Sequence, residues 1–291
     1  MRSVKILIMR GGAIGDFILT LPVFQALLAE WPQAEIECIG YPRTTELALA
    51  GGLIRRAHSL DRSNMTQLYV PDTYLTPADR NYYRSFNFII SYLFDPDDLV
   101  RENLITNGAK EVLYGGHARE DVTAHATEFL MKPLEAYAIY PGHPVPELSF
   151  GKVEREARLV IHPGSGSAQK NWPLERYIEL ARKAEKHLPV SFSLGEADEP
   201  LELALRKALP EADMIQEPEL LDAARRIQTA THFLGNDTGI THLAAALGLN
   251  VTALFGPSDP SIWGPRGRGS VTILDQMADR SVDEVLAAVL A

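Results

Sequence analysis

Short apolar runs alternate with longer amphipathic stretches along the whole chain. In the first half, β-rich apolar runs predict strands near 4–9, 35–40, 56–60, 86–91 and 111–114. Helical spacing of apolar positions predicts helices near 14–30, 44–51, 77–84, 97–106 and 120–135. Pro22 lies well inside the first of these helices, so we expect a kink or a break there. Strands that alternate with helices are typical of a parallel sheet covered by helices.

A second series of strands and helices follows a segment that is unsuited to regular structure. The segment AIYPGHPVPELSFGKVERE, residues 138–156, interrupts the pattern with prolines, glycines and charges, and we interpret it as a linker. After it, RLVIH, VSFSL, ADMIQ, THFLG, NVTALF and VTIL predict strands, and helices are expected near 173–187, 198–208, 218–229, 239–247 and 281–290. The fold class is therefore α/β, with one doubly wound domain over 1–150 and a second over 151–291. The last helix could also pack back on the N-terminal domain.

Composition and charge narrow the classes of partner. The chain has 291 residues, 46% hydrophobic and 23% charged, which is typical of a soluble globular protein. Its net charge is −10, and neither half is basic: 13 Lys and Arg face 18 Asp and Glu in residues 1–150, and 15 face 20 in the rest. We therefore expect no nucleic-acid partner and at most peripheral membrane association.

The chain shows no pattern of a secretory signal or of a transmembrane helix, so we expect a cytoplasmic protein that can also lie at the inner face of the cytoplasmic membrane. The single cysteine, Cys38, lies in an apolar run. It excludes an intramolecular disulfide, and we expect a buried, inert thiol.

The first predicted strand runs into the segment RGGAIGDFILTLP. Its glycines, Gly11, Gly12 and Gly15, are spaced G-G-x-x-G, which fits the G-x-G-x-x-G of a dinucleotide-binding loop imperfectly. Flexible backbone and free amides at a helix N-terminus suit an anion or a closely approaching substrate. Asp16, in the first turns of that helix, is either an acid that complements the helix dipole or a chemical group of a site.

A second motif is LVIHPGSGSAQKNWPLERY, in which a strand ends at His162. Ser165, Gly166 and Ser167 form a small-residue loop, and Lys170 follows before the next helix begins. Hydroxyls, free amides and an ammonium beyond a strand end are what a phosphate requires. The G-x-x-x-x-G-K-[ST] pattern of a P-loop is absent, and the alternative is an ordinary Gly/Ser turn.

A third motif is THFLGNDTGITHLAAA, in which a strand delivers polar residues to a helix start. Thr238 and Gly239 can present a hydroxyl and free amides to a diphosphate, aided by the helix dipole. His242 follows one turn later, and Asp237 precedes the helix. A structural histidine is the default for His242 alone, but beside so many polar groups we favour a binding role.

Acidic residues follow two further strands. In VSFSLGEADEP, an acid beyond the strand end can hold two ribose hydroxyls, and Glu196 and Glu199 are both candidates for this acid. The alternative is that these acids are solvated residues at the start of a helix. In the first half we interpret Asp95-Pro96-Asp97 as a helix cap. The histidines lack the spacing of a metal site, so we expect neither a metal nor another cofactor.

Taken together, four segments resemble glycosyltransferase family 9, the heptosyltransferases of lipopolysaccharide core synthesis. They are RGGAIGDFILTLP, HPGSGSAQKNWP, NDTGITHLAAA and LFGPSDP, in the order of the family and covering both halves. The resemblance implies a GT-B fold, in which two Rossmann-like domains face a central cleft. It also implies an inverting, metal-independent transfer of a sugar, such as heptose from ADP-heptose, to an acceptor hydroxyl of lipopolysaccharide core or another glycan. The acceptor would be a glycan or lipid-linked glycan bound by the N-terminal domain.

The resemblance also implies roles for particular residues. Asp16 resembles the general base, and Lys170 resembles the residue that neutralises the leaving diphosphate. Glu199 is expected at the ribose and Asp237 at the donor sugar. The remaining donor ligands implied are Ser165, Gly166, Ser167, Thr238, Gly239 and His242, and on the acceptor side Arg10, Gly11 and Gly12.

Three alternatives stay open from the residues. One is a nucleotide-sugar epimerase or hydrolase on the same fold, and another is a nucleotide-sugar-binding protein without turnover. A nicotinamide-dependent oxidoreductase is disfavoured, because the first glycine loop departs from the dinucleotide pattern and the better phosphate loops lie in the second half.

Overall fold

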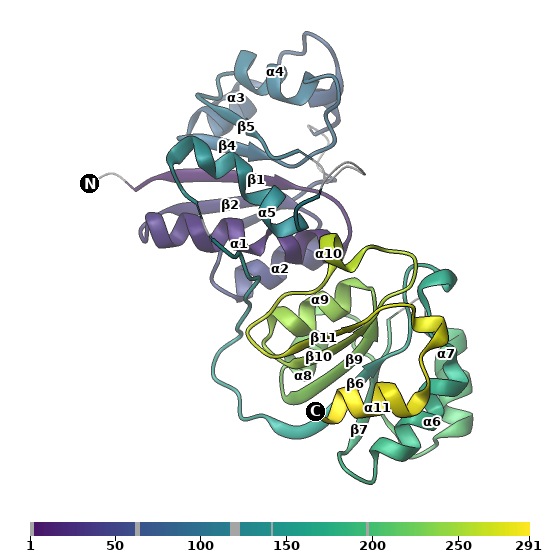
Figure 1. Ribbon diagram of the computed structural model, residues 1–291. Helices are drawn as coiled ribbons and strands as arrows, with labels where there is room; N and C mark the ends of the chain where they lie inside the picture. Colours follow the sequence, from purple (N-terminus) through teal and green to yellow (C-terminus); the bar gives the residue numbers. More distant parts are fainter. Residues whose placement is uncertain (1–2, 62–64, 117–122, 141, 196–197) are drawn as a thin grey trace. The chain divides into compact units, whose positions relative to one another are not determined.

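The computed structural model describes residues 3–61, 65–116, 123–140, 142–195 and 198–291, and they form two compact units (Figure 1). The first unit is Met1–Pro144 and the second is Val145–Ala291. This division falls six residues before the predicted boundary at 150, because the end of the linker already belongs to the second unit. There the backbone N–H of Leu148 donates to the carbonyl of Ala246, and Glu147 pairs with Arg268 at 2.7 Å.

The first unit is built on a parallel sheet. Its strands are β1 (Lys5–Arg10), β2 (Glu35–Gly40), β3 (Arg56–Ser59), β4 (Phe88–Ser91) and β5 (Val112–Tyr114), in the order β3-β2-β1-β4-β5. Its helices are α1 (Ile14–Glu30), α2 (Pro42–Ala50), α3 (Pro77–Arg84), α4 (Leu99–Thr106) and α5 (Ala126–Met131), with 3₁₀ helices η1 (Thr66–Tyr69) and η2 (Lys132–Tyr137). Strands and helices thus lie within a few residues of the predicted ranges. In the last predicted helix, 120–135, residues 120–122 lie outside the described part.

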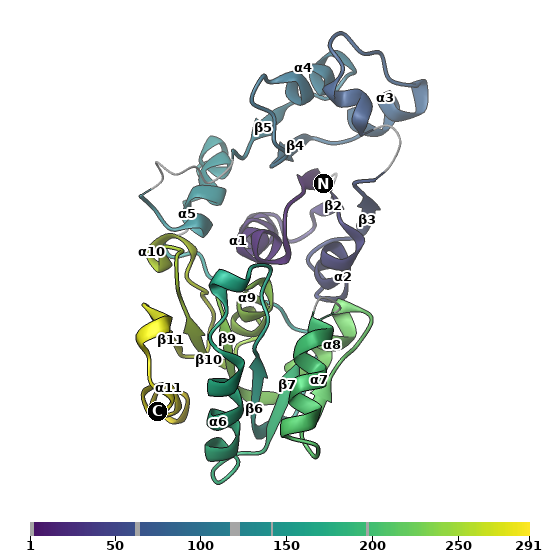
Figure 2. The same ribbon diagram turned by 90° about the vertical axis from the view of Figure 1, so that its right-hand side faces the viewer.

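Helices cover both faces of this sheet. Figures 1 and 2 show α1 and α2 on one side and α3 and α4 on the other. On the α3 and α4 side, one buried cluster joins the alternate β1 residues Leu7 and Met9 to Tyr83, Phe86 and Leu104. Burial on both faces explains why these strands read as continuous apolar runs in the sequence.

Helix α1 continues through Pro22, so the helix does not break there, and the expected kink stays a prediction. Proline removes one backbone donor and costs about 3 kcal/mol or more in a helix interior. The apolar side chains around it, including Phe17, Leu21 and Phe24, are at most 1% exposed. Their burial offsets that cost, since each such side chain contributes about 1.5–3 kcal/mol.

The second unit contains a longer parallel sheet. Its strands are β6 (Glu156–His162), β7 (Val190–Ser193), β8 (Asp213–Ile215), β9 (Ala230–Asn236), β10 (Asn250–Leu254) and β11 (Val271–Leu274), in the order β11-β10-β9-β6-β7-β8. Its helices are α6 (Leu174–Ala184), α7 (Glu199–Ala208), α8 (Leu220–Ile227), α9 (Gly239–Ala246), α10 (Pro260–Trp263) and α11 (Val282–Leu290), with 3₁₀ helices η3 (Ala168–Lys170) and η5 (Met277–Asp279). The short α10 and the 3₁₀ helices had no counterpart in the predicted pattern, because each is too short for an apolar period to show.

Helix α11 completes the core of the second unit. Its residues Val282, Val285 and Val289 are buried in one cluster with residues of α6, α7 and the sheet, and it lies beside α6 (Figure 1). The sequence allowed this helix to pack on the N-terminal domain. In the structure its buried face packs against the second unit.

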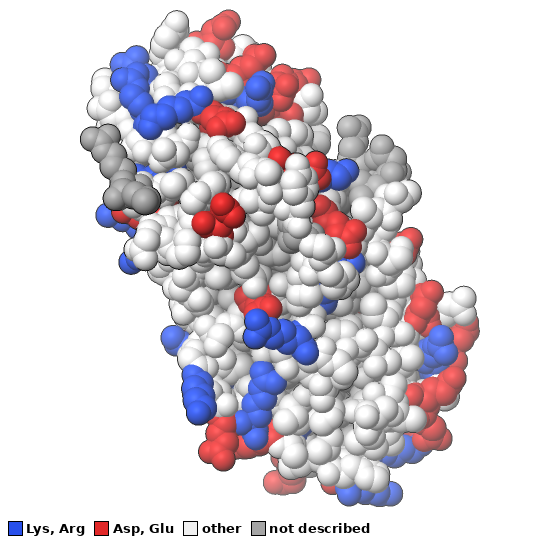
Figure 3. Space-filling view, turned by 60° about the vertical axis from the view of Figure 1, so that its left-hand side comes forward, with Lys and Arg blue, Asp and Glu red and all other residues white. Residues whose placement is uncertain are grey.

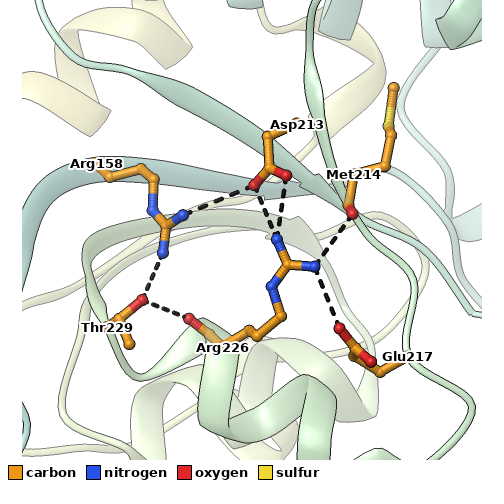
Figure 4. Close-up of polar contacts among 6 residues, drawn as sticks. All are labelled: Arg158, Asp213, Met214, Glu217, Arg226 and Thr229. Carbon is orange, nitrogen blue, oxygen red and sulfur yellow. Dashed lines mark hydrogen bonds and ion pairs between the residues drawn. The ribbon is translucent and has the colours of Figure 1, made fainter.

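A polar network fixes the β8 edge of the second sheet (Figure 4). Arg226 of α8 contacts both carboxylate oxygens of Asp213 at 3.1 Å and reaches Glu217 at 3.2 Å. Arg158 of β6 approaches the same Asp213 at 3.7 Å and also bonds the Thr229 hydroxyl. The short strand β8 is thereby tied to α8 and to the middle of the sheet by side chains as well as by its ladder.

In both units the strand order reverses beside the first strand. Numbered from its own first strand, each sheet reads 3-2-1-4-5, and the second continues to 6. Ligands of such sheets bind beyond the carboxyl ends of the strands at the point where the order reverses. These points lie between β1 and β4 in the first unit and between β6 and β9 in the second.

Candidate active site

The glycine loop after β1 brings the backbone close to Asp16 in the first unit. Gly12 has φ +92°, and a Cβ there would lie 2.8 Å from Asp16 Oδ2. A Cβ at Gly11 would meet Leu60 at 3.4 Å and Leu93 at 3.8 Å. Gly12 therefore has to be glycine for its conformation and for this approach, whereas Gly11 fits between two apolar side chains.

The Asp16 carboxylate is held from two sides. Oδ2 accepts a hydrogen bond of 2.9 Å from the backbone N–H of Ala13, the residue that caps α1, and Oδ1 lies 3.4 Å from Arg10 Nη2. The side chain is still 38% exposed. Asp16 thus complements the helix N-terminus and at the same time presents a fixed, accessible carboxylate beyond the central strand of the sheet.

Arg10, expected on the acceptor side, is a buried partner of Asp16. Only 6% of Arg10 is exposed; Nε donates to Thr20 Oγ1 at 2.9 Å, and Nη2 donates to the Asp16 carbonyl at 2.9 Å. Burial lowers the pKa of the guanidinium, and the nearby Asp16 opposes that effect. The last residue of this central strand points into the unit, where its guanidinium contacts Thr20 and Asp16.

In the second unit, the structure brings Lys170 and Asp237 together from motifs 67 residues apart. Lys170 Nζ lies 2.6 Å from Asp237 Oδ2, with side chains 34% and 9% exposed. Lys170 ends η3 after β6, and Asp237 follows β9, so the pair stands where the strand order reverses. A cation and an acid predicted to contact the donor are therefore neighbours.

Asn236 organises this point, and sequence reasoning assigned it no role. Its side chain is fully buried. Oδ1 accepts from the Tyr177 hydroxyl at 2.7 Å and from the Trp172 backbone N–H at 3.1 Å, while Nδ2 donates to the Pro163 carbonyl at 2.8 Å. The end of β9 is thus fastened to both ends of the loop after β6. A polar residue directly after the apolar Phe233, Leu234 and Gly235 of the strand was the signal that could have found it.

The remaining residues of the loop after β6 differ in what they offer. The Ser165 hydroxyl is engaged within the loop, since it donates to the Ser167 carbonyl at 2.7 Å and accepts from the Ser167 N–H at 3.2 Å. Gly166 and Ser167 are exposed. A Cβ at Gly164 would lie 2.0 Å from Asp198 Oδ1, so glycine is required there for the loop to pass the acid.

Helix α9 begins beside Asp237. Thr238 is its N-cap, and the Thr238 hydroxyl accepts from the Thr241 N–H at 3.4 Å. Gly239 is its first residue, and His242 is 5% exposed one turn along. The positive end of a helix dipole therefore lies next to the Lys170–Asp237 pair.

The acids after β7 have different environments. Glu196 lies outside the described residues. Asp198 is 7% exposed and accepts from the Gly195 N–H at 2.8 Å, so it is a structural acid of the loop. Glu199 is exposed and lines a cavity of about 420 Å³ at the ends of β7 and β8, together with Glu202 and Glu217.

Buried His162 marks the end of β6. Its Nδ1 lies 2.8 Å from the Ser193 carbonyl. Burial lowers the pKa of this imidazole, while Asp198 and the bond to Ser193 act in the opposite direction. His162 therefore joins two neighbouring strand ends below the loop.

Two further expectations concern single residues. The Asp95 carboxylate accepts from the N–H groups of Val100 and Arg101, both at 3.0 Å, in the first turn of α4, which confirms the helix cap. Cys38 is fully buried, and burial raises the pKa of its thiol to about 12, as expected of an inert thiol.

Three properties concern larger parts of the molecule. Within the described ranges, no group of three His, Cys, Asp or Glu residues is arranged to hold a metal ion. In the same part of the chain, no helix is both long and apolar enough to cross a membrane. On the face drawn in Figure 3, acidic and basic side chains are interspersed among uncharged ones.

Comparisons with known proteins agree on one family. The family model described as glycosyltransferase family 9 (heptosyltransferase) matches residues 120–284. The chain is 36% identical over 116 residues to lipopolysaccharide heptosyltransferase 1 of Pseudomonas aeruginosa, covering 39% of this chain and 32% of that protein. It is 32% identical over 103 residues to lipooligosaccharide heptosyltransferase 2 of Haemophilus influenzae, covering 33% and 30%. These matches thus span about a third of the curated relatives.

Solved structures share the fold over nearly the whole chain. ADP-heptose LPS heptosyltransferase II of E. coli superposes with a TM-score of 0.76 at 17% identity, covering 98% of this chain and 97% of that one. A family 9 glycosyltransferase of Veillonella parvula gives 0.75 at 16% identity, covering 99% and 97%. The two doubly wound units are therefore the two Rossmann-like domains of a GT-B fold. With a family model that matches more than half of its length, the chain belongs to glycosyltransferase family 9.

Proposed function

We propose that this protein is an inverting glycosyltransferase that moves a heptose from ADP-heptose to a hydroxyl of a glycan acceptor, without a metal. The observation that carries the proposal is the group of donors at the β6–β9 reversal. Lys170, the capping Thr238 and the N-terminus of α9 lie together there. The choice of ADP-heptose follows the relatives, among which E. coli heptosyltransferase WaaC has been solved with ADP and with ADP-2-deoxy-2-fluoro heptose.

The charges along the second sheet edge support one orientation of the donor. At β6 and β9 an ammonium and a helix N-terminus favour the diphosphate. At β7 and β8 the cavity is lined by Glu199, Glu202 and Glu217, which would repel phosphate but can accept hydrogen bonds from ribose hydroxyls. The nucleoside would therefore occupy the β7–β8 cavity, with Glu199 as the ribose ligand.

Lys170 then acts on the leaving group. Lys170 Nζ forms an ion pair with Asp237 Oδ2 at 2.6 Å, so the net charge of the two side chains is close to zero before the donor binds. As the bond between the anomeric carbon and the diphosphate oxygen breaks, negative charge grows on that oxygen. Lys170 and the amides at Gly239 stabilise this charge more strongly in the transition state than in the ground state. Asp237 remains beside the sugar.

Asp16 removes the proton of the acceptor. The acceptor oxygen attacks the anomeric carbon, its proton passes to the Asp16 carboxylate, and the nucleoside diphosphate leaves, which inverts the configuration. Arg10 Nη2, 3.4 Å from Oδ1, holds the carboxylate from one side. The hydrogen bond from Ala13 fixes its orientation.

Donor binding is tested by calorimetry with ADP, UDP and ADP-heptose. We expect ADP and ADP-heptose to bind, and Lys170→Met to weaken both at least tenfold, as for loss of a charge-assisted contact of about 1.5–3 kcal/mol. Lys183→Met is the matched control, because Lys183 is a paired surface lysine of the same unit, 2.7 Å from Asp283. Undiminished affinity in Lys170→Met would remove this residue from the donor site.

The base is tested by Asp16→Asn. We expect donor affinity to be kept while turnover falls by about 10²–10⁴, the usual cost of losing a general base. Asp79→Asn is the control, since Asp79 is likewise an acid in the first turn of a helix in the first unit. If Asp16→Asn retains turnover, the base is elsewhere.

The alternatives give different products. A hydrolase would release ADP and free sugar from ADP-heptose without an acceptor, and an epimerase would return an altered nucleotide sugar. A binding protein would retain the affinity and give neither. Chromatography of ADP-heptose incubated with and without a core oligosaccharide acceptor distinguishes these cases.

A further inference from the structure

A second cavity lies at the ends of β4 and β5 in the first unit. It has a volume of about 570 Å³ and is lined by Phe94, Pro96, Tyr114, Gly115, Gly116, Phe129 and Lys132. Phe94 is 67% and Tyr114 40% exposed, so two large rings present their surface at the cavity. Exposed aromatic surface gathered in a cavity marks a binding site more often than a packing fault.

The glycines make this cavity possible. A Cβ at Gly115 would lie 2.1 Å from the ring of Tyr92, and Gly116 has φ +67° with a Cβ position 2.9 Å from Phe129. Side chains at these two positions would collide with rings of the wall. The backbone after β5 is therefore pressed against aromatic side chains.

More tyrosines continue along the same strand edge. Tyr41 follows β2 and is 42% exposed, and Tyr69 of η1 is 43% exposed. Burial raises the pKa of the Tyr69 phenol, and Asp95, Tyr114 and Tyr41 lie near enough to add to the shift. The rings thus form a half-exposed row, with hydroxyls that can bond to a polar ligand.

The position of the row relates it to Asp16. Strand β4 is the direct neighbour of β1, with Met9 opposite Ser91, and β5 is next, with Ser91 opposite Tyr114. Neighbouring strands lie roughly 5 Å apart, so the cavity is roughly 5–10 Å along the edge from the loop between β1 and α1. A spacing of this size corresponds to one or two sugar rings of a glycan.

We propose that the cavity at Phe94 and Tyr114 is a subsite that stacks a sugar ring of the acceptor next to the ring that receives the new sugar. This rests on the proposed function, which places the acceptor hydroxyl at Asp16. The C–H face of a sugar ring packs on an aromatic face, while its hydroxyls need polar partners at the rim. Tyrosine rings, each apolar in body and polar at the tip, supply both.

Lys132 gives the subsite its charge preference. Among the described residues that line the cavity it is the one charged residue, and its Nζ lies 5.2 Å from the centroid of the Phe129 ring. The ammonium is therefore placed at the aromatic wall, where it can bond to ring oxygens and best of all to an acidic substituent. A concave cavity whose described lining holds a cation beside aromatic rings suits a single sugar ring better than a flat lipid surface.

The test measures sugar binding without any donor. Saturation-transfer NMR is recorded with methyl glucoside, methyl mannoside, methyl galactoside and methyl glucuronide. We expect transfer to ring protons, strongest for the glucuronide, and a roughly fivefold loss in Phe94→Ala and Tyr114→Ala, with Tyr114→Phe retaining most of it. Lys132→Met should weaken the glucuronide more than the neutral sugars.

Tyr74→Ala is the matched control, because Tyr74 is a 77% exposed ring of the same unit outside the cavity. Transfer to none of the four sugars, or equal transfer in Phe94→Ala and wild type, would overturn the subsite. So would loss of binding to phosphatidylglycerol vesicles in Phe94→Ala with sugar binding unchanged. ADP titration of the same samples keeps the two proposals apart: sugar binding without ADP binding refutes the donor site alone, and the reverse refutes the subsite alone.

Discussion

Replacement of Asn236 by alanine tests whether one buried side-chain amide holds the loop after β6 in place. The substitution removes hydrogen bonds of 2.7–3.1 Å to the Tyr177 hydroxyl, the Trp172 N–H and the Pro163 carbonyl, and two longer ones of 3.4 Å from Nδ2. Each contributes about 1 kcal/mol net, and each buried partner left unsatisfied costs further. We therefore expect the second unit to lose about 3–5 kcal/mol of unfolding free energy, or roughly 10 °C in Tm.

The assay is designed to report on the second unit. The chain has three tryptophans, of which Trp31 lies in the first unit and Trp172 and Trp263 in the second. In a Trp31→Phe background, tryptophan fluorescence during urea or thermal unfolding therefore follows the second unit. Since the loop after β6 loses its anchor, ADP affinity should fall together with stability.

Asn250→Ala is the control, because Asn250 is exposed and its side chain makes a single 3.2 Å bond to the Ser270 N–H. We expect it to cost at most about 1 kcal/mol. If Asn236→Ala shifts the transition no more than Asn250→Ala, the anchoring role of Asn236 is refuted.

Three further predictions concern other parts of the chain. Burial lowers the pKa of His162, so near pH 6.5 the imidazole is protonated in the unfolded chain but stays neutral in the folded chain. The unfolding free energy should therefore fall as the pH drops below about 6.5. The urea midpoint should therefore depend less steeply on pH, between pH 5 and 8, in His162→Gln than in the wild type. His232, whose pKa burial also lowers, is kept in both proteins. Equal pH dependence in the two proteins would contradict this prediction. Cys38, with its pKa raised to about 12, should resist Ellman's reagent at pH 8 until urea unfolds the first unit, and rapid labelling of native protein would be inconsistent with its burial. Arg226→Gln should cost about 1 kcal/mol or less, since its contacts to Asp213 are half-exposed, and 1 M salt should shrink the difference; a large, salt-insensitive loss would show that the network is worth more than its exposure suggests.

The sequence by itself determined the order of strands and helices and the loops that carry chemistry. Strands buried on both faces appear as apolar runs, and covering helices appear as longer amphipathic stretches, so periods of a few residues were enough to place them. The motif segments also identified the family correctly, because glycines, hydroxyls and Lys170 cluster within short stretches. The break considered at Pro22 does not occur, since the burial of the surrounding helix outweighs the local cost of proline.

Only the tertiary structure decided which of these residues meet. The reversal of strand order between β6 and β9 places Lys170 against Asp237 across 67 residues, and no local pattern contains that pairing. The same holds for Arg10, which packing turns inward to Asp16, and for Asn236, whose partners come from a distant loop. Asp198 and Glu199 are adjacent in the chain, yet one is buried in its loop and the other lines a cavity. Side-chain direction depends on long-range packing. The sequence motifs could therefore identify candidate site residues, whereas their contacts followed only from the tertiary structure.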